Sequence, residues 1–287
     1  MNSCLGRKAK QPASEAITKE EWLQHFKDVY KSDVGVEEGF ATPDLGALPA
    51  VEELDEAISE DEVRRALGRL KGGKACGSDN ILPEMLKAAE GGYITFLTKF
   101  FNTVFLNEGY PEKWREAIIV PIHKKGPRDS PNNYRGISLL SLIGKCYVAV
   151  LNTRLYLWLE DNQKLSETQA GFRKGYSTTD HIFSLYAATQ KYLSKPAKLY
   201  VCFVDLRRAY DSVKHSTLFR ALARAGVSGK FKAVLAMYNS LKACVRVKSE
   251  FTDFFECPQG LRQGCGASTT FFSLIINEIA EKNGFRR

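Results

Sequence analysis

The stretch YVCFVDLRRAYDSV, from Tyr200 to Val213, combines a short apolar run with an acidic and an aromatic residue. Residues 200–205 are apolar and partly β-branched up to Asp205, which is typical of a strand buried on both faces. Asp205 would then lie where the strand reaches the surface, a usual position for a functional carboxylate in α/β sheets. Asp205 could equally cap a following helix, and this stretch alone favours neither interpretation.

Composition limits the class of protein. The 287 residues suffice for about two domains, and the net charge of +8 suits a polyanionic partner without requiring one. Seven scattered cysteines without a C-x-x-C pair indicate reduced thiols in an intracellular protein, cytoplasmic or nuclear, and argue against a zinc site. No secretory signal pattern and no apolar run of ~20 residues is present, so we expect no membrane partner.

The N-terminal part predicts helices separated by irregular segments. Residues 1–17 are polar and predicted to be disordered, and residues 31–54 are predicted to be a linker. Helices are predicted over 18–30 and from 59 to about 70, because both segments begin with capping-box patterns. A further helix is predicted over the apolar segment 93–107. The glycine- and lysine-bearing segment 71–87 could hold phosphates, but a turn before a helix starting at Pro83 is the favoured interpretation.

A basic turn follows the predicted strand AIIVPI, residues 117–122. The turn HKKGPRDSPNNYRG, residues 123–136, carries Lys124, Lys125 and Arg135 between glycines and prolines that predict a connection between two strands. Flexible lysines beside a forked guanidinium are suited to binding a triphosphate. Spacing alone slightly favours a solvated basic loop.

Two later loops are candidates for ligand contact. In QAGFRKGYST, residues 169–178, aromatic residues alternate with Arg173 and Lys174, a pattern that can stack on bases and neutralise phosphates but has low specificity. In PQGLRQGCGAS, residues 258–268, Gln263 and Gly264 precede a predicted helix and could contact a sugar or base, or only satisfy turn geometry. Other predicted elements are helices at 139–159, 179–193, 216–225 and 230–241 and a strand at 243–248 that 251–256 could pair with.

In this order the motifs form a specific signal. From residue 58 to 281 the chain resembles the reverse transcriptases of non-LTR (LINE-type) retrotransposons, through ISEDEVRRALGRLKGGKACGSDNILPEMLK, VPIHKKGPRDSPNNYRGISLLSLIGK, QAGFRKGYSTTD, FVDLRRAYDSV and GLRQGC. The resemblance implies an α+β right-hand polymerase fold with fingers, an incomplete palm and no thumb. The implied division is 1–57 as a disordered start, helix and linker, 58–115 as a helical extension, 116–197 as fingers and 198–287 as partial palm.

The resemblance also implies roles for individual residues. Asp205 would bind the two catalytic Mg²⁺ ions, and Tyr210 would reject the 2′-hydroxyl of ribonucleotides. Gln263 and Gly264 would contact the incoming deoxynucleoside triphosphate, whose phosphates would meet Arg135 and Lys125, with Lys124 adjacent. The partners would be an RNA template and a DNA primer. Asp211 belongs to the same motif, and for it we expect only a local capping role.

Two departures from the family pattern shape the functional expectation. No two aspartates are adjacent in this sequence, although the family places an Asp-Asp turn after the helix that follows Gln263. The sequence also has Gly266 to Thr269 where the family usually has Pro-Leu-Ser-Pro. We therefore expect a truncated polymerase that is inactive as these residues alone, with a non-catalytic nucleic-acid-binding remnant as the alternative. A third possibility is an unpaired sheet edge that aggregates.

Overall fold

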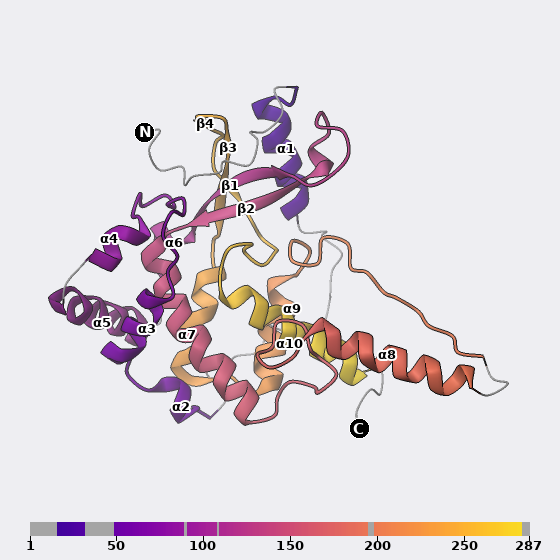
Figure 1. Ribbon diagram of the computed structural model, residues 1–287. Coiled ribbons are helices and arrows are strands. Elements are labelled where there is room, and N and C mark those ends of the chain that lie inside the picture. The colour runs from indigo at the N-terminus through magenta and orange to yellow at the C-terminus, as the bar shows by residue number, and fades with distance from the viewer. Residues whose placement is uncertain (1–15, 32–48, 89–90, 108, 195–197, 283–287) are drawn as a thin grey trace.

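The protein is described by a computed structural model over residues 16–31, 49–88, 91–107, 109–194 and 198–282 (Figure 1). Its described part combines helices with one five-stranded sheet in the order β2-β1-β3-β4, with β5 also paired to β3, as the predicted α+β class requires. Residues 1–15 of the predicted disordered start and most of the predicted linker lie outside the described residues. The end of the predicted disordered start is wrong, because Ile17 is 3% exposed and packs in the core. No described helix is long and apolar enough to cross a membrane.

The sheet is built on the hairpin that the sequence predicted. Strand β1 (Glu116–His123) pairs antiparallel with β2 (Tyr134–Leu140), which places Ile122 opposite Arg135. On its other side β1 runs parallel to β3 (Lys242–Val247), whose antiparallel partners are the short strands β4 (Glu250–Phe251) and β5 (Phe255–Glu256). The predicted pairing of 243–248 with the segment after it is confirmed.

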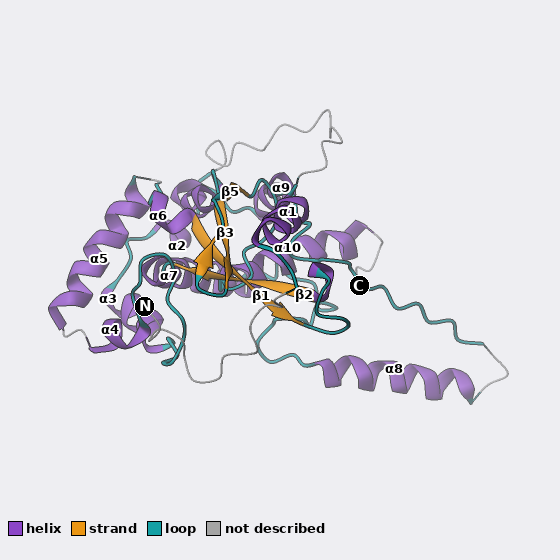
Figure 2. Ribbon diagram, turned by 90° about the horizontal axis from the view of Figure 1, so that it is seen from above, coloured by secondary structure: helices purple, strands orange, loops and turns teal. Residues whose placement is uncertain are grey.

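Helices cover the sheet and form the rest of the core (Figure 2). The described helices before the hairpin are α1 (Lys19–Tyr30), α2 (Glu52–Asp55), α3 (Glu60–Gly68), α4 (Pro83–Ala88), α5 (Gly91–Leu106) and α6 (Glu112–Arg115). After the hairpin, which includes the 3₁₀ turn η2 (Pro131–Asn133), come α7 (Leu142–Asp161), α8 (Thr178–Leu193), α9 (His215–Ala225), the 3₁₀ segment η3 (Gly229–Tyr238) and α10 (Ala267–Lys282). The capping boxes predicted at Thr18 and Ser59 are both present.

Helix α7 is the central helix, and one arginine ties the N-terminal helices to it. The guanidinium of Arg154 donates to both carboxylate oxygens of Glu62, at 2.6 and 2.7 Å, and to the carbonyls of Glu56 and Ala57. Its side chain is 9% exposed, so these acceptors satisfy a guanidinium that is removed from water. This network fixes the start of α3 against the helix that follows the hairpin.

The predicted strand at 200–205 is wrong. Residues 198–206 have no helix or strand assignment and pair with no strand in the described part of the chain. Tyr200, Phe203 and Val204 are 81–85% exposed. A strand needs a neighbour for its N–H and C=O groups, and within the described residues nothing runs beside this segment. The apolar side chains of this segment are therefore exposed, although their composition is typical of a buried strand.

Helix α8, which precedes this segment, also stands away from the body of the protein. It overlaps α10 in the view of Figure 1, whereas Figure 2 shows it well separated from the sheet. None of its residues is buried, and Ile182 and Phe183 are 67% and 69% exposed. The helix was correctly predicted over 179–193, but the apolar face that its pattern carries is not covered within the described chain.

Candidate functional site

Three segments far apart in the sequence meet beside the hairpin. The turn that follows residue 205 is joined to the loop at 258–266 by two main-chain hydrogen bonds, from Leu261 N to Tyr210 O and from Gly260 N to Val213 O, each 2.8 Å long. The same loop is joined to β2, because Ser138 N donates to Gln263 O at 2.9 Å. Both predicted segments, the one with Tyr210 and the one with Gln263, therefore form one rigid frame with the hairpin.

Gly264 is required where this loop touches β2. Its φ of +123° lies in a region that residues with a Cβ avoid. A Cβ added here would lie 2.6 Å from the carbonyl oxygen of Ser138, a backbone atom that cannot move aside. The glycine thus lets the loop approach the strand, and this places Gln263 beside the turn.

Asp211 holds the side chain of Gln263, a contact that the sequence analysis missed. The amide Nε2 of Gln263 donates to Asp211 Oδ1 at 2.9 Å. Burial raises the pKa of the Asp211 carboxyl to about 6, against the opposing effects of the Gln263 hydrogen bond and the Arg208 charge. The local capping role expected for Asp211 is therefore replaced by a contact across the site. No local pattern pointed to a partner so distant in the sequence.

Tyr210 is held between two aromatic rings. Its ring stacks on Phe272 of α10, with centroids 4.8 Å apart and planes at 18°, and meets the edge of Phe172 at 6.4 Å. Phe172 is 63% exposed and has a φ of +61°, which is unfavourable for a bulky residue. Burial raises the pKa of Tyr210. The loop at 169–178 therefore reaches the site through Phe172.

The predicted cations of the hairpin lie at its exposed edge. Lys124, Lys125 and Arg135 are all exposed, and none has an ion pair with a described residue. Asn132 on the hairpin accepts a hydrogen bond from Arg208 at 3.0 Å, which ties the turn after Asp205 to the basic loop. The hairpin and the turn thus face a common region with cations available to a ligand.

Asp205 lies on the exposed segment and not at the end of a buried strand. Its side chain is open to solvent. Among the described residues no group of three or more His, Cys, Asp or Glu side chains could hold a metal ion. One carboxylate can share a single Mg²⁺ with waters and substrate phosphates, but Asp205 alone does not fit a site for two ions.

Arg173 requires a correction, because its guanidinium does not face a ligand. The side chain is 4% exposed and donates to both oxygens of Glu160, at 3.0 and 2.6 Å, and to the carbonyl of Ser166. It also lies over the ring of Tyr176 at 4.2 Å. The predicted nucleic-acid-binding role of Arg173 is therefore replaced by a structural one, and the role of the exposed Lys174 stays a prediction.

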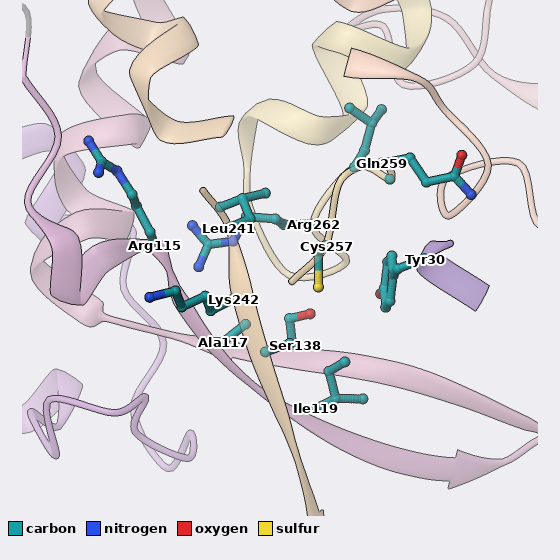
Figure 3. A pocket seen from close by; sticks show the side chains of 13 residues that line it. Tyr30, Arg115, Ala117, Ile119, Ser138, Leu241, Lys242, Cys257, Gln259 and Arg262 are labelled. Atoms are coloured by element: carbon teal, nitrogen blue, oxygen red, sulfur yellow. The ribbon is translucent and has the colours of Figure 1, made fainter. Parts of the chain in front are cut away.

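A second arginine, Arg262, anchors the loop and lines a small pocket (Figure 3). Arg262 is 6% exposed and donates to the carbonyls of Trp114, at 2.8 Å, and Glu116, at 3.0 Å. These carbonyls belong to the end of α6 and the start of β1. Arg262 therefore adds a second attachment of the loop to the base of the hairpin, besides the contact of Ser138 with Gln263. Its position one residue before Gln263 was not interpreted from the sequence.

Comparisons with known proteins are consistent with this arrangement. The family model described as reverse transcriptase (RNA-dependent DNA polymerase) matches residues 122–284. Three relatives from Drosophila melanogaster are the probable RNA-directed DNA polymerases from transposon BS (26% identical) and from transposon X-element (27%) and the RNA-directed DNA polymerase from mobile element jockey (25%). The matches cover 79%, 83% and 85% of this chain but only 25%, 28% and 26% of the relatives, so the chain spans about a quarter of their length.

Proposed function

The chain belongs to the reverse transcriptase (RNA-dependent DNA polymerase) family, and from this premise we propose that it binds a deoxynucleoside triphosphate beside an RNA template and a DNA primer. The resemblance to non-LTR reverse transcriptases drawn from the sequence is confirmed. The function by family is copying RNA into DNA, with the hairpin region as fingers and the region after residue 198 as part of a palm. The domain division given above remains part of this proposal.

The observation that carries the proposal is the frame formed by the hairpin, the Tyr210 turn and the Gln263 loop. Arg135 and Lys125, with Lys124 adjacent, would bind the triphosphate, because exposed cations beside an open surface suit a polyanion. The ring of Tyr210 would contact the sugar from its aromatic support. Gln263 would supply a polar group to the nucleotide, and Gly264 would set its position by letting the loop approach β2.

Catalysis is a separate question from binding. Nucleotidyl transfer commonly uses two metal ions that neutralise charge on both sides of the reacting phosphate. The described residues contain no group of three or more His, Cys, Asp or Glu side chains that could hold a metal ion, and Asp205 lies on an exposed segment, so we assign no catalytic step to a metal in this chain. We propose that these 287 residues alone do not extend a primer.

Nucleotide binding tests the proposal directly. A fluorescent dATP analogue in the presence of Mg²⁺ should bind the wild-type chain, and Arg135→Ala should weaken binding about tenfold, because a hydrogen bond to a charged group contributes about 1.5 kcal/mol or more. Lys99→Ala removes an exposed lysine of α5 and should leave the affinity unchanged. Equal affinity of wild type and Arg135→Ala would contradict the proposed site.

Primer extension on an RNA template tests the expected lack of catalysis. The wild-type chain with Mg²⁺ and all four deoxynucleoside triphosphates should give no extended primer. A template-dependent product that disappears in Asp205→Ala would show that the chain is catalytic and that the carboxylate is used. A product of equal yield in both proteins would indicate a contaminating polymerase.

The second candidate function is nucleic-acid binding without catalysis. It is favoured by the net charge of +8, and the described residues contain no group of three or more His, Cys, Asp or Glu side chains that could hold a metal ion. Binding to a single-stranded RNA should weaken as salt rises, with a log–log slope of about −0.7 per phosphate contacted, because each contact releases counterions. An affinity independent of salt would exclude backbone binding.

A further inference from the structure

Gln263 is held by two hydrogen bonds, one through its main chain and one through its side-chain amide. Its main-chain carbonyl accepts from Ser138 N at 2.9 Å, and its side-chain Nε2 donates to Asp211 Oδ1 at 2.9 Å. Gln263 is half-buried, while the next residue, Gly264, is exposed. The Gln263 side chain is therefore partly accessible to solvent, next to an exposed position of the loop.

The chemistry of the partner decides which end of the amide is free. A terminal amide has one carbonyl oxygen that accepts and one NH₂ group that donates, and the two can exchange places by rotation of the last side-chain bond. An ionised carboxylate only accepts, so Asp211 selects the NH₂ end. Within the described chain, Gln263 Oε1 has no hydrogen-bond donor of its own.

We propose that Asp211 is a positioning residue that orients the Gln263 amide, so that the nucleotide site presents a hydrogen-bond acceptor, Gln263 Oε1, to the incoming ligand. This inference rests on the proposed function. A ligand group that donates, such as a sugar hydroxyl or a base N–H, is favoured at this point. A group that only accepts meets an unfavourable contact there.

The groups around Asp211 define how this orientation responds to pH. Arg208 lies in the same turn, Gln263 faces the carboxylate from the loop, and Tyr30 faces it from α1, with a phenol whose pKa burial raises further from neutrality. Because its pKa is raised, Tyr30 does not change charge near neutral pH. A protonated Asp211 has both an O–H donor and a carbonyl acceptor, so it no longer selects one orientation of the Gln263 amide. Acidification should therefore weaken the binding of a ligand that needs the acceptor.

The experiment measures the affinity of the fluorescent dATP analogue, with Mg²⁺, between pH 5 and pH 8. Asp211→Asn should bind three- to tenfold more weakly than wild type at pH 7.5, because asparagine can hold the amide in either orientation. The ratio of the two affinities should fall towards one near pH 5, where wild-type Asp211 is protonated. Taking this ratio cancels the titration of the nucleotide phosphates, which both proteins share.

A double-mutant cycle isolates the contact from general effects on the fold. Gln263→Ala should weaken binding, and Asp211→Asn should add no further loss in that background. Asp253→Asn, an exposed acid between β4 and β5, serves as the matched control and should bind like wild type at every pH. The pH profile of wild type against Gln263→Ala needs no change at Asp211, so it decides the matter even if the asparagine variant does not fold.

The outcomes separate the two proposals. If wild type binds and Gln263→Ala weakens binding, but Asp211→Asn matches wild type across the pH range, the positioning role is refuted and the proposed function stands. Additive losses in the double mutant also refute it. If wild type does not bind the probe, or binds it equally well after Arg135→Ala, the proposed function itself fails.

Discussion

Replacing Asp211 by asparagine should stabilise the folded protein at neutral pH while it weakens nucleotide binding. Burial raises the pKa of this carboxyl from 3.8 to about 6, so the folded state binds its proton more tightly than the unfolded state does. Asparagine has nearly the same shape, and its side-chain oxygen can still accept from Gln263 Nε2. The substitution thus removes a charge that is costly to bury and retains the hydrogen bond.

The size and sign follow from this pKa. A shift of about two units corresponds to ~3 kcal/mol at 1.36 kcal/mol per unit. The side chain is only half-buried and the variant also loses the attraction of Arg208, so we expect a gain of ~1–2 kcal/mol. Between about pH 4 and pH 6 the folded state holds more protons, so the wild-type free energy of unfolding falls as pH rises. The asparagine variant lacks this fall.

Urea denaturation followed by tryptophan fluorescence at pH 4 and pH 7.5 measures the effect. The variant should match wild type at pH 4 and exceed it at pH 7.5, and Asp253→Asn should show the same difference from wild type at both pH values. The reasoning is refuted if Asp211→Asn is less stable than wild type at pH 7.5, or if its gain is the same at both pH values.

Three further substitutions have definite expected results. Gly264→Ala should lower stability by ~1–3 kcal/mol and weaken binding of the dATP analogue at least tenfold, because both the φ of Gly264 and the nearby β2 carbonyl exclude a Cβ. Thermal unfolding and titration measure these effects, and an unchanged affinity would contradict the prediction. Arg173→Ala should lower the free energy of unfolding by about 3 kcal/mol, because it leaves Glu160 without its partner. The RNA affinity of the folded variant should not change, and a loss of salt-dependent binding would restore the predicted ligand role of Arg173. Arg154→Ala should lower the free energy of unfolding by a similar ~3 kcal/mol, because the contacts to Glu62 and two carbonyls are lost. Urea unfolding measures this change, and a change within ~0.5 kcal/mol would contradict the prediction.

Local signals in the sequence predicted local structure well. The helix starts at Thr18 and Ser59 were predictable because a capping box joins residues only three positions apart. The β1–β2 hairpin was predictable because an apolar run next to a turn rich in glycine and proline leaves few alternatives. The exposed cations of the hairpin follow from the same turn, since a turn between strands is solvated.

Contacts between distant segments could not be predicted in the same way. The hydrogen bond from Gln263 to Asp211 depends on how the loop at 258–266 crosses the turn, and no periodicity in either segment encodes that crossing. Arg173 shows the converse error: a cation in an aromatic-rich loop was interpreted as a ligand group, whereas Glu160 at the end of α7 binds it. The strand at 200–205 was predicted from composition, but a strand depends on a neighbour that composition does not supply.

The turn from Arg208 to Asp211 contains two features that lower its local stability. Arg208 has a φ of +51°, a conformation that costs of order 1 kcal/mol or more for a residue with a long side chain. Asp211 carries a charge that burial disfavours. In exchange, Arg208 reaches the hairpin through Asn132 and Asp211 reaches the loop through Gln263. A turn selected for stability alone would use glycine and a neutral residue at these positions, so this combination supports selection for holding the hairpin and the loop in a fixed relation, as a shared ligand between them would require.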